Sequence, residues 1–198
     1  MRGVGVKGLV ATSAVLIAWS LKRHYADATA DDLSWILTPT ARLVGVMTGA
    51  TFTFERGEGQ FSREHMFLIE KSCAGINFMI AAFGMLVFAL FHRVGSVVSG
   101  TRVLVASLAA SYSAAIVVNA VRIALALWLA AHPAVLPALG AATVHRLEGI
   151  VVYFGSLVLL YELVQYVDGR GLAVDWGLGQ KASGFRSQKS APTGADAR

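Results

Sequence analysis

Apolar residues in this chain of 198 residues gather into long runs that are separated by polar connections. Most runs approach the roughly 17–25 residues that cross a bilayer core as a helix. The predicted fold class is an all-α integral membrane protein, a small polytopic helical bundle with a short extracytoplasmic hairpin or interfacial segment. We predict four spans, at about residues 8–21, 74–91, 103–125 and 145–167.

Two of these runs depart from the ordinary pattern of a span. The first follows Arg2 and Lys7, as in a signal peptide, but the sequence from Trp19 to Arg23 is a poor small-residue cleavage site. We therefore expect a retained first helix. The third run stays apolar from Val103 to Ala131, which exceeds one crossing, so the helix either projects beyond the core or breaks near residues 119–122.

The connection between the first two spans, residues 22–72, is mostly polar but contains an apolar segment. This segment, residues 33–50, is interrupted by Pro39 and Arg42. The interruption favours an interfacial or re-entrant piece over a full crossing, and a crossing here stays open as the alternative.

The rest of this connection alternates between apolar and polar residues. Residues 51–55 alternate, residues 57–59 form a turn signal, and residues 61–69 are strand-permissive. This pattern predicts a small hairpin outside the bilayer.

Composition agrees with a membrane protein. Hydrophobic residues make up 56% of the chain and charged residues 15%, against about a quarter charged in soluble domains. The net charge of +5 lies beside the apolar runs, so membrane orientation explains it better than nucleic-acid binding. We expect one membrane-embedded domain, residues 1–167, and a disordered cytoplasmic tail, residues 168–198, that is rich in Gly, Ser, Lys and Arg.

The distribution of Lys and Arg predicts an orientation in the plasma (inner) membrane. Such residues favour cytoplasmic loops, which places the N-terminus, residues 92–102 and the tail inside. The large segment between the first two spans and the uncharged residues 132–144 then lie outside. This topology brings Cys73, Arg122 and His145, each from a different span, to a similar depth near the outer face.

Cys73 is the only cysteine, so the chain has no internal disulfide. It stands at the start of the second span in Ser72-Cys73-Ala74-Gly75, where small residues would let a substrate backbone approach. A nucleophile needs the thiolate, which positive neighbours favour. Taken alone, a free cysteine is more often a small buried hydrophobe.

Arg122 lies within an apolar run, where a charge costs at least about 2.5 kcal/mol and usually faces a polar interior or a functional site. Snorkelling to the headgroups is the alternative. Asn119 precedes it by three residues on the same helical face, which indicates a polar stripe.

His145 opens the last span and is either a functional or an ordinary interfacial residue. Glu148 and Gly149 lie one turn later on its face, and Glu148 could orient the imidazole or offset Arg146. The other histidines fall in connections, so we predict no metal site and no cofactor. Aromatic residues near the span ends, Tyr153 among them, are interpreted as an interfacial belt.

These blocks together resemble the exosortase/archaeosortase family, most of all the short subfamily called exosortase K. The resemblance covers order, spacing and membrane placement from about residue 70 to 165. It implies a membrane cysteine transpeptidase that recognises exported proteins by a C-terminal motif, a transmembrane helix and a basic cluster. It rests on residues 72–78 (SCAGINF), residues 119–123 (NAVRI), and His145 with Gly149.

The three ionisable groups suffice for thiol-based acyl transfer. Cys73 would attack the scissile carbonyl and form a thioester, with His145 as general base and then general acid. Arg122 would stabilise the thiolate or the oxyanion, and Asn119 could add a donor. A surface or membrane-lipid acceptor, or water, would resolve the thioester. The alternatives are a plain hydrolytic protease and a non-enzymatic assembly or transport subunit with a polar path.

Overall fold

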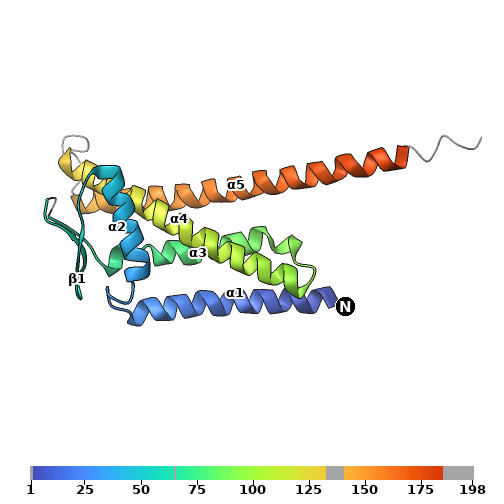
Figure 1. The fold of residues 1–198 in the computed structure, drawn as a ribbon, viewed down its shortest axis with the longest axis horizontal. Helices are drawn as coiled ribbons and strands as arrows, with labels where there is room; N and C mark the ends of the chain where they lie inside the picture. Colours follow the sequence, from blue (N-terminus) through green and yellow to red (C-terminus); the bar gives the residue numbers. More distant parts are fainter. Residues whose placement is uncertain (1, 65, 133–140, 185–198) are drawn as a thin grey trace, which may run out of the picture. The chain divides into compact units, whose positions relative to one another are not determined.

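The structure is a computed structural model. It describes residues 2–64, 66–132 and 141–184, with the backbone alone for residues 2–3, 141–145 and 170–184. The chain divides into two compact units, Met1–Tyr161 and Glu162–Arg198, and everything that follows on packing concerns the first unit. The elements, in order, are α1 (Arg2–Asp27), α2 (Ser34–Thr48), β1 (Thr53–Glu55), β2 (Gly59–Ser62), β3 (Phe67–Ile69), η1 (Lys71–Cys73), α3 (Ile76–Ala89), η2 (Phe91–Arg93), α4 (Val97–Ala131) and α5 (Ala141–Gly184) (Figure 1).

The protein is mostly helical, and its described residues include four helical stretches long and apolar enough to cross a membrane. They agree with the four predicted spans and with a helical membrane protein. The first and third stretches extend beyond the predicted spans at both ends, and the second and fourth lie within three residues of the predicted bounds. The four stretches are Val4–Asp27, Lys71–Ala89, Val97–Ala131 and Arg146–Gly169.

The helix α4 resolves the question of the long third run. It is continuous over 35 residues, so there is no break at residues 119–122. At 1.5 Å per residue it is about 52 Å long. This exceeds a hydrocarbon core of about 30 Å, so an α4 that crosses a bilayer would tilt or extend beyond the core.

The segment expected to be interrupted, residues 33–50, forms the single helix α2 of 15 residues. Pro39 lies inside it and cannot donate to the carbonyl of Trp35, four residues earlier. The hydroxyl of Tyr112 on α4 donates to that carbonyl instead, at 2.8 Å, and the Trp35 and Tyr112 rings stack. A contact between helices therefore lets α2 continue through its proline. At about 22 Å, α2 is shorter than the hydrocarbon core.

The predicted hairpin is present as β1 and β2, which pair antiparallel with Glu55 opposite Gly59. The stretch expected as one further strand, residues 61–69, instead turns after Ser62, so that β3 adds a third antiparallel strand in the order β1-β2-β3. Gly59 has a φ of 125°, and a Cβ there would collide with the Ile69 carbonyl oxygen. Only glycine fits this close approach.

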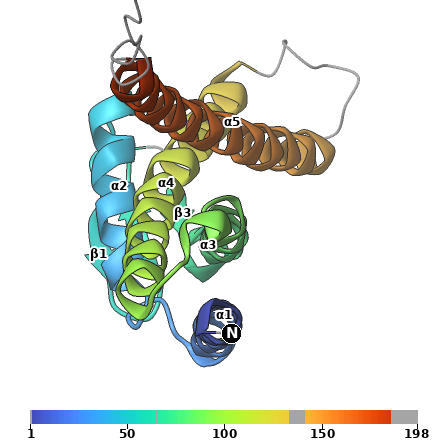
Figure 2. The same cartoon turned by 90° about the vertical axis from the view of Figure 1, so that its right-hand side faces the viewer.

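Successive long helices of the first unit run antiparallel, and α4 lies between α2 and α3 (Figures 1 and 2). The end of α1, the sheet and the start of α3 therefore gather at one end, which we call the sheet end. The main core also lies toward this end, with buried side chains from α2, α3, α4 and the residues before them. Its largest members include Leu33, Ile36, Leu37, Ile69, Ile76 and Met79.

The boundaries near the C-terminus differ from those expected. The helix α5 begins at Ala141, not at His145, and of the predicted connection residues 133–140 lie outside the described part. The part of α5 that is apolar enough to cross a membrane ends at Gly169, close to the predicted end of the span at residue 167. The helix continues to Gly184, through a stretch without proline, where a disordered tail was expected. The rest of that tail, residues 185–198, lies outside the described residues.

Candidate functional site

Cys73 ends the short 3₁₀ turn η1 immediately before α3. Gly75 follows it as the N-cap of α3 with a φ of 69°, a left-handed conformation that favours glycine. A Cβ at Gly75 would also lie 3.2 Å from the side-chain Cγ of Asn119. Glycine thus lets the turn that carries Cys73 lie directly against α4.

Asn119 is fully buried, at 0% exposure, and its amide joins three elements. Its Nδ2 donates to the backbone carbonyl of Cys73, and its Oδ1 accepts from the hydroxyl of Tyr153 at 2.9 Å. The expected role of Asn119 as a donor in the reaction stays a prediction. One of its N–H groups holds the cysteine turn.

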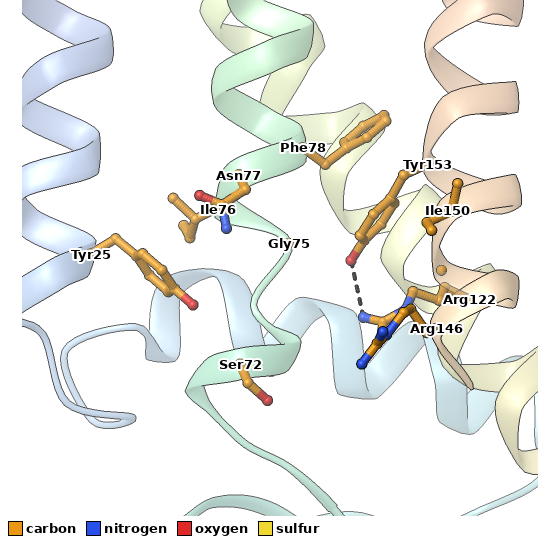
Figure 3. Close-up of a pocket in the computed structure, with 11 residues that line it drawn as sticks. Tyr25, Ser72, Gly75, Ile76, Asn77, Phe78, Arg122, Arg146, Ile150 and Tyr153 are labelled. Atoms are coloured by element: carbon orange, nitrogen blue, oxygen red, sulfur yellow. Dashed lines mark hydrogen bonds between the residues drawn. The ribbon is translucent and has the colours of Figure 1, made fainter. Parts of the chain in front are cut away.

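Arg122 and Tyr153 meet in the space between α4 and α5. The Nη1 of Arg122 donates to the Tyr153 hydroxyl at 3.2 Å, and the guanidinium lies 5.3 Å from the centre of the Tyr153 ring (Figure 3). The Tyr153 ring also stacks on Phe78 of α3, with centres 5.4 Å apart. A cation and the face of an aromatic ring in such contact attract each other, and the attraction is strongest away from water.

The backbone of α5 approaches Arg122 at Gly149. A Cβ at Gly149 would lie 3.3 Å from the Nε of Arg122. One residue earlier, Glu148 is only 7% exposed, and its carboxylate interacts electrostatically with Arg122. A half-buried cation between apolar helices is stabilised by a counter-charge, and Glu148 provides one.

These groups face a cavity of about 540 Å³. Arg122 and Arg146 both line it, whereas no Asp or Glu of the described residues does, so its wall is positive. The aromatic and aliphatic part of the wall comes from α1, α3 and α5 (Figure 3). The lining residues are Tyr25, Ser72, Gly75, Ile76, Asn77, Phe78, Arg122, Arg146, Gly149, Ile150 and Tyr153.

The thiol of Cys73 lies beside this cavity rather than among its lining residues. The side chain is half-buried, and its Sγ lies 3.8 Å from the Oγ of Ser72, which lines the cavity and donates to Glu70 at 2.6 Å. The thiol is close enough to Arg122 and to Tyr153 to interact with both electrostatically.

The wall opposite Arg122 belongs to α1. Tyr25 lines the cavity there, and the ammonium groups of Lys22 and Lys71 lie 5.6 and 5.3 Å from the centre of its ring. Lys22 donates to the Asn77 side chain at 2.7 Å, and Lys71 donates to the carbonyl of Ala26 at 3.0 Å. These bonds tie α1 to the cysteine turn and to α3.

The structure thus brings most of the predicted site residues to one place. One residue, His145, cannot be compared. It lies four residues before Gly149 on α5, but its side chain lies outside the described residues, so its role stays a prediction. The residues that the structure brings together are Ser72, Cys73, Gly75, Asn119, Arg122, Glu148 and Gly149.

Tyr153 is the site residue that the sequence analysis misplaced. Expected in an interfacial belt, it lies between Phe78, Asn119 and Arg122 instead. A signal for it exists in the sequence, because 145, 149 and 153 follow each other at intervals of four on one face of a helix.

No family model, no curated protein and no solved structure matches this chain. Within the described residues, no group of three or more His, Cys, Asp or Glu side chains is placed to hold a metal ion. What the site can do therefore has to be argued from its own geometry, which offers a thiol, a fixed cation and an open cavity beside them.

Proposed function

We propose that this protein is a membrane cysteine peptidase or transpeptidase of the exosortase type. It cleaves exported proteins at their C-terminal sorting signals through a thioester on Cys73, and it transfers the cleaved proteins to a surface or lipid acceptor. One observation carries the proposal. A chain of hydrogen bonds runs from the Cys73 carbonyl through Asn119 and Tyr153 to Arg122, beside a cavity of about 540 Å³.

The chemistry assigns a role to each group. The Cys73 sulfur, as thiolate, forms a bond to the carbonyl carbon of the scissile peptide. The C–N bond then breaks, and the leaving amine takes a proton from His145, which had accepted the proton of the thiol. An amine, a hydroxyl or water then gives a proton to His145 and bonds to the thioester carbon, and the C–S bond breaks to release the acylated acceptor or free acid and the Cys73 thiolate.

Arg122 supplies the charge that this reaction needs. Its guanidinium is held between Tyr153 and the backbone of Gly149, so it does not have to reorganise as negative charge develops on sulfur or oxygen. At the edge of the protein interior a fixed charge acts more strongly than in bulk water. Glu148 lies close to this half-buried cation in the resting protein and is its counter-charge.

The place of the cavity suits a substrate that is itself anchored in the bilayer. The cavity lies where α3 begins, at the sheet end. The Lys and Arg distribution puts this end on the extracytoplasmic side of the plasma membrane. A sorting signal whose helix lies in the bilayer would present the extended residues before that helix at this depth.

The test is processing of an exported reporter that ends in a motif, a transmembrane helix and a basic cluster, co-expressed with the protein and followed by its change in size. We expect Cys73→Ala, Cys73→Ser, Arg122→Ala and His145→Ala each to lower the rate on the order of 10³-fold or more while the protein still inserts. The matched controls are Arg102→Ala and His132→Ala, which remove the same residue types from α4 and its end.

Full processing by Cys73→Ala would overturn the proposal and favour the non-enzymatic assembly or transport subunit. Equal losses in the control variants would show that removal of any cationic or imidazole side chain harms the protein. A released product that carries no acceptor would assign hydrolysis in place of transfer.

A further inference from the structure

The hydroxyl of Tyr153 stands at the centre of the hydrogen-bond chain. It donates to the Oδ1 of Asn119 at 2.9 Å and accepts from the Nη1 of Arg122 at 3.2 Å. A phenolic hydroxyl has one proton to donate, so its donor capacity is fully used. One oxygen on α5 therefore fixes two side chains of α4 that lie three residues apart.

The ring of Tyr153 is positioned independently of its hydroxyl. It stacks on Phe78 with ring centres 5.4 Å apart, and the guanidinium of Arg122 lies over it. Replacement by phenylalanine would keep both of these contacts and the shape of the cavity wall. The role of the hydroxyl can thus be separated from the role of the ring.

Arg122 needs such a partner because its side chain is long and flexible. An arginine within a membrane helix can otherwise extend along the helix toward the headgroups. The bond to Tyr153 and the close backbone of Gly149 hold the guanidinium at the cavity wall instead. The planar guanidinium also forms directional hydrogen bonds, so the position of its acceptor sets its own.

The hydrogen bond that the hydroxyl donates connects it, through Asn119, to the turn of the nucleophile. Asn119 accepts from Tyr153 and donates to the Cys73 carbonyl, in the turn that carries the thiol. The same oxygen therefore sets the position of the cation and, through one amide, the position of the sulfur. Loss of the hydroxyl would change the distance between the two.

We propose that Tyr153 is a positioning residue, whose hydroxyl holds the Arg122 guanidinium and, through Asn119, the Cys73 turn in register with each other. This role rests on the proposed function for its catalytic meaning. It concerns a physical property of the resting protein, however, and can be measured without any substrate.

The experiment is the rate of iodoacetamide alkylation against pH, on the purified full chain, whose single cysteine makes Cys73 the only thiol that reacts. Removal of the nearby charge in Arg122→Gln is expected to move the profile to higher pH by about one unit. Tyr153→Phe is expected to move it in the same direction by about 0.5–1 unit, with alkylation near neutral pH slowed roughly three- to tenfold.

Tyr112→Phe is the matched control. It removes a tyrosine hydroxyl that makes one 2.8 Å hydrogen bond and belongs to a stacked ring, but on a part of α4 away from the cavity. Its alkylation profile should match that of the unmodified protein, even where its thermal stability falls. Gel filtration and circular dichroism establish that each variant is folded before the profile is measured.

A double variant decides between positioning and an independent effect. If Tyr153 acts through Arg122, the profile of Arg122→Gln with Tyr153→Phe equals that of Arg122→Gln alone, because coupled residues are not additive. A Tyr153→Phe profile that superimposes on the unmodified protein, or shifts that add in the double variant, would overturn the role. A shifted profile together with processing that survives Cys73→Ala would leave the positioning role intact and reject the proposed function.

Discussion

At the sheet end of the first unit, hydrogen bonds join residues far apart in the chain, whereas at the opposite end they join near neighbours. The bonds from Asn119 to Cys73 and to Tyr153 span 46 and 34 residues, and that from Arg122 to Tyr153 spans 31. At the turn between α3 and α4, Ser96 and Ser99 bond to each other, and their remaining bonds are to the neighbouring backbone of Gly95 and Gly100. The candidate site lies where the long-range bonds are.

Apolar packing follows the same division. The core at the sheet end draws buried side chains from α2, α3, α4 and β3. At the opposite end the buried cluster consists of Val10, Val94 and Val103. There α1 approaches α4 at Gly100, where a Cβ would lie 2.5 Å from a methyl carbon of Val10. Small residues and a local cap suffice to close that turn, whereas a polar site needs partners from several helices.

The comparison predicts the largest effect for Asn119→Leu. Leucine is of similar size but leaves the Cys73 carbonyl and the Tyr153 hydroxyl without their partner. At about 1–3 kcal/mol for each buried unsatisfied group, the free energy of unfolding should fall by roughly 2–6 kcal/mol. Processing should be lost as well. Denaturant unfolding of the purified protein measures the first effect, and the reporter measures the second.

Val121→Leu, on an exposed face of α4 two residues further on, is the control and should leave both properties unchanged. An Asn119→Leu protein as stable as the unmodified one would show that the long-range bonds do not hold the sheet end together.

The features predicted from the sequence are those that depend on contacts between near neighbours in the chain. Apolar runs give the four long helices, because crossing a bilayer fixes their length and composition. The turn signals at residues 57–59 give the β1–β2 hairpin, because glycine conformations are local. The predictions of Cys73, Arg122 and Asn119 as site residues came from where each stands relative to its own span, which is again a local property.

The remaining features depend on contacts between helices and could not be read from one segment. Pro39 predicts an interruption. However, the Tyr112 hydroxyl donates to the Trp35 carbonyl that the proline leaves without its helical donor, and α2 continues. The position of Tyr153 in the sequence predicts an interfacial aromatic residue, and only its hydrogen bonds to Asn119 and Arg122 place it in the site. No spacing in the sequence shows that a Cβ at Gly75 would lie 3.2 Å from the Asn119 side chain, because 44 residues separate the two positions.

A smaller effect is expected at the opposite end from Ser96→Ala. Ser96 caps α4 by accepting from the backbone of Ser99, and the Ser99 side chain bonds back to Ser96. Loss of this capping box should lower the free energy of unfolding by about 0.5–2 kcal/mol. Processing and the alkylation profile of Cys73 should not change, because no hydrogen bond among the described residues connects this cap to the cavity. A loss of processing as large as that of Asn119→Leu would abolish the distinction between the two ends.

The smallest effect distinguishes the position of a hydrogen bond in the molecule from the separation of its residues along the chain. Asp32 lies at the sheet end but outside the spans, and it accepts from the backbone and the hydroxyl of Thr29, only three residues away. The backbone donor first, and the hydroxyl second, hold the pKa of Asp32 below its ordinary value. Its contribution to stability is therefore present above about pH 4 and is lost as the pH falls through the lowered pKa. Melting temperatures of the unmodified protein and of Asp32→Asn should thus differ slightly at neutral pH and converge under acid. If Asp32→Asn instead lowers stability as much as Asn119→Leu, position in the molecule, and not the separation of the bonded residues along the chain, decides how much a hydrogen bond contributes here.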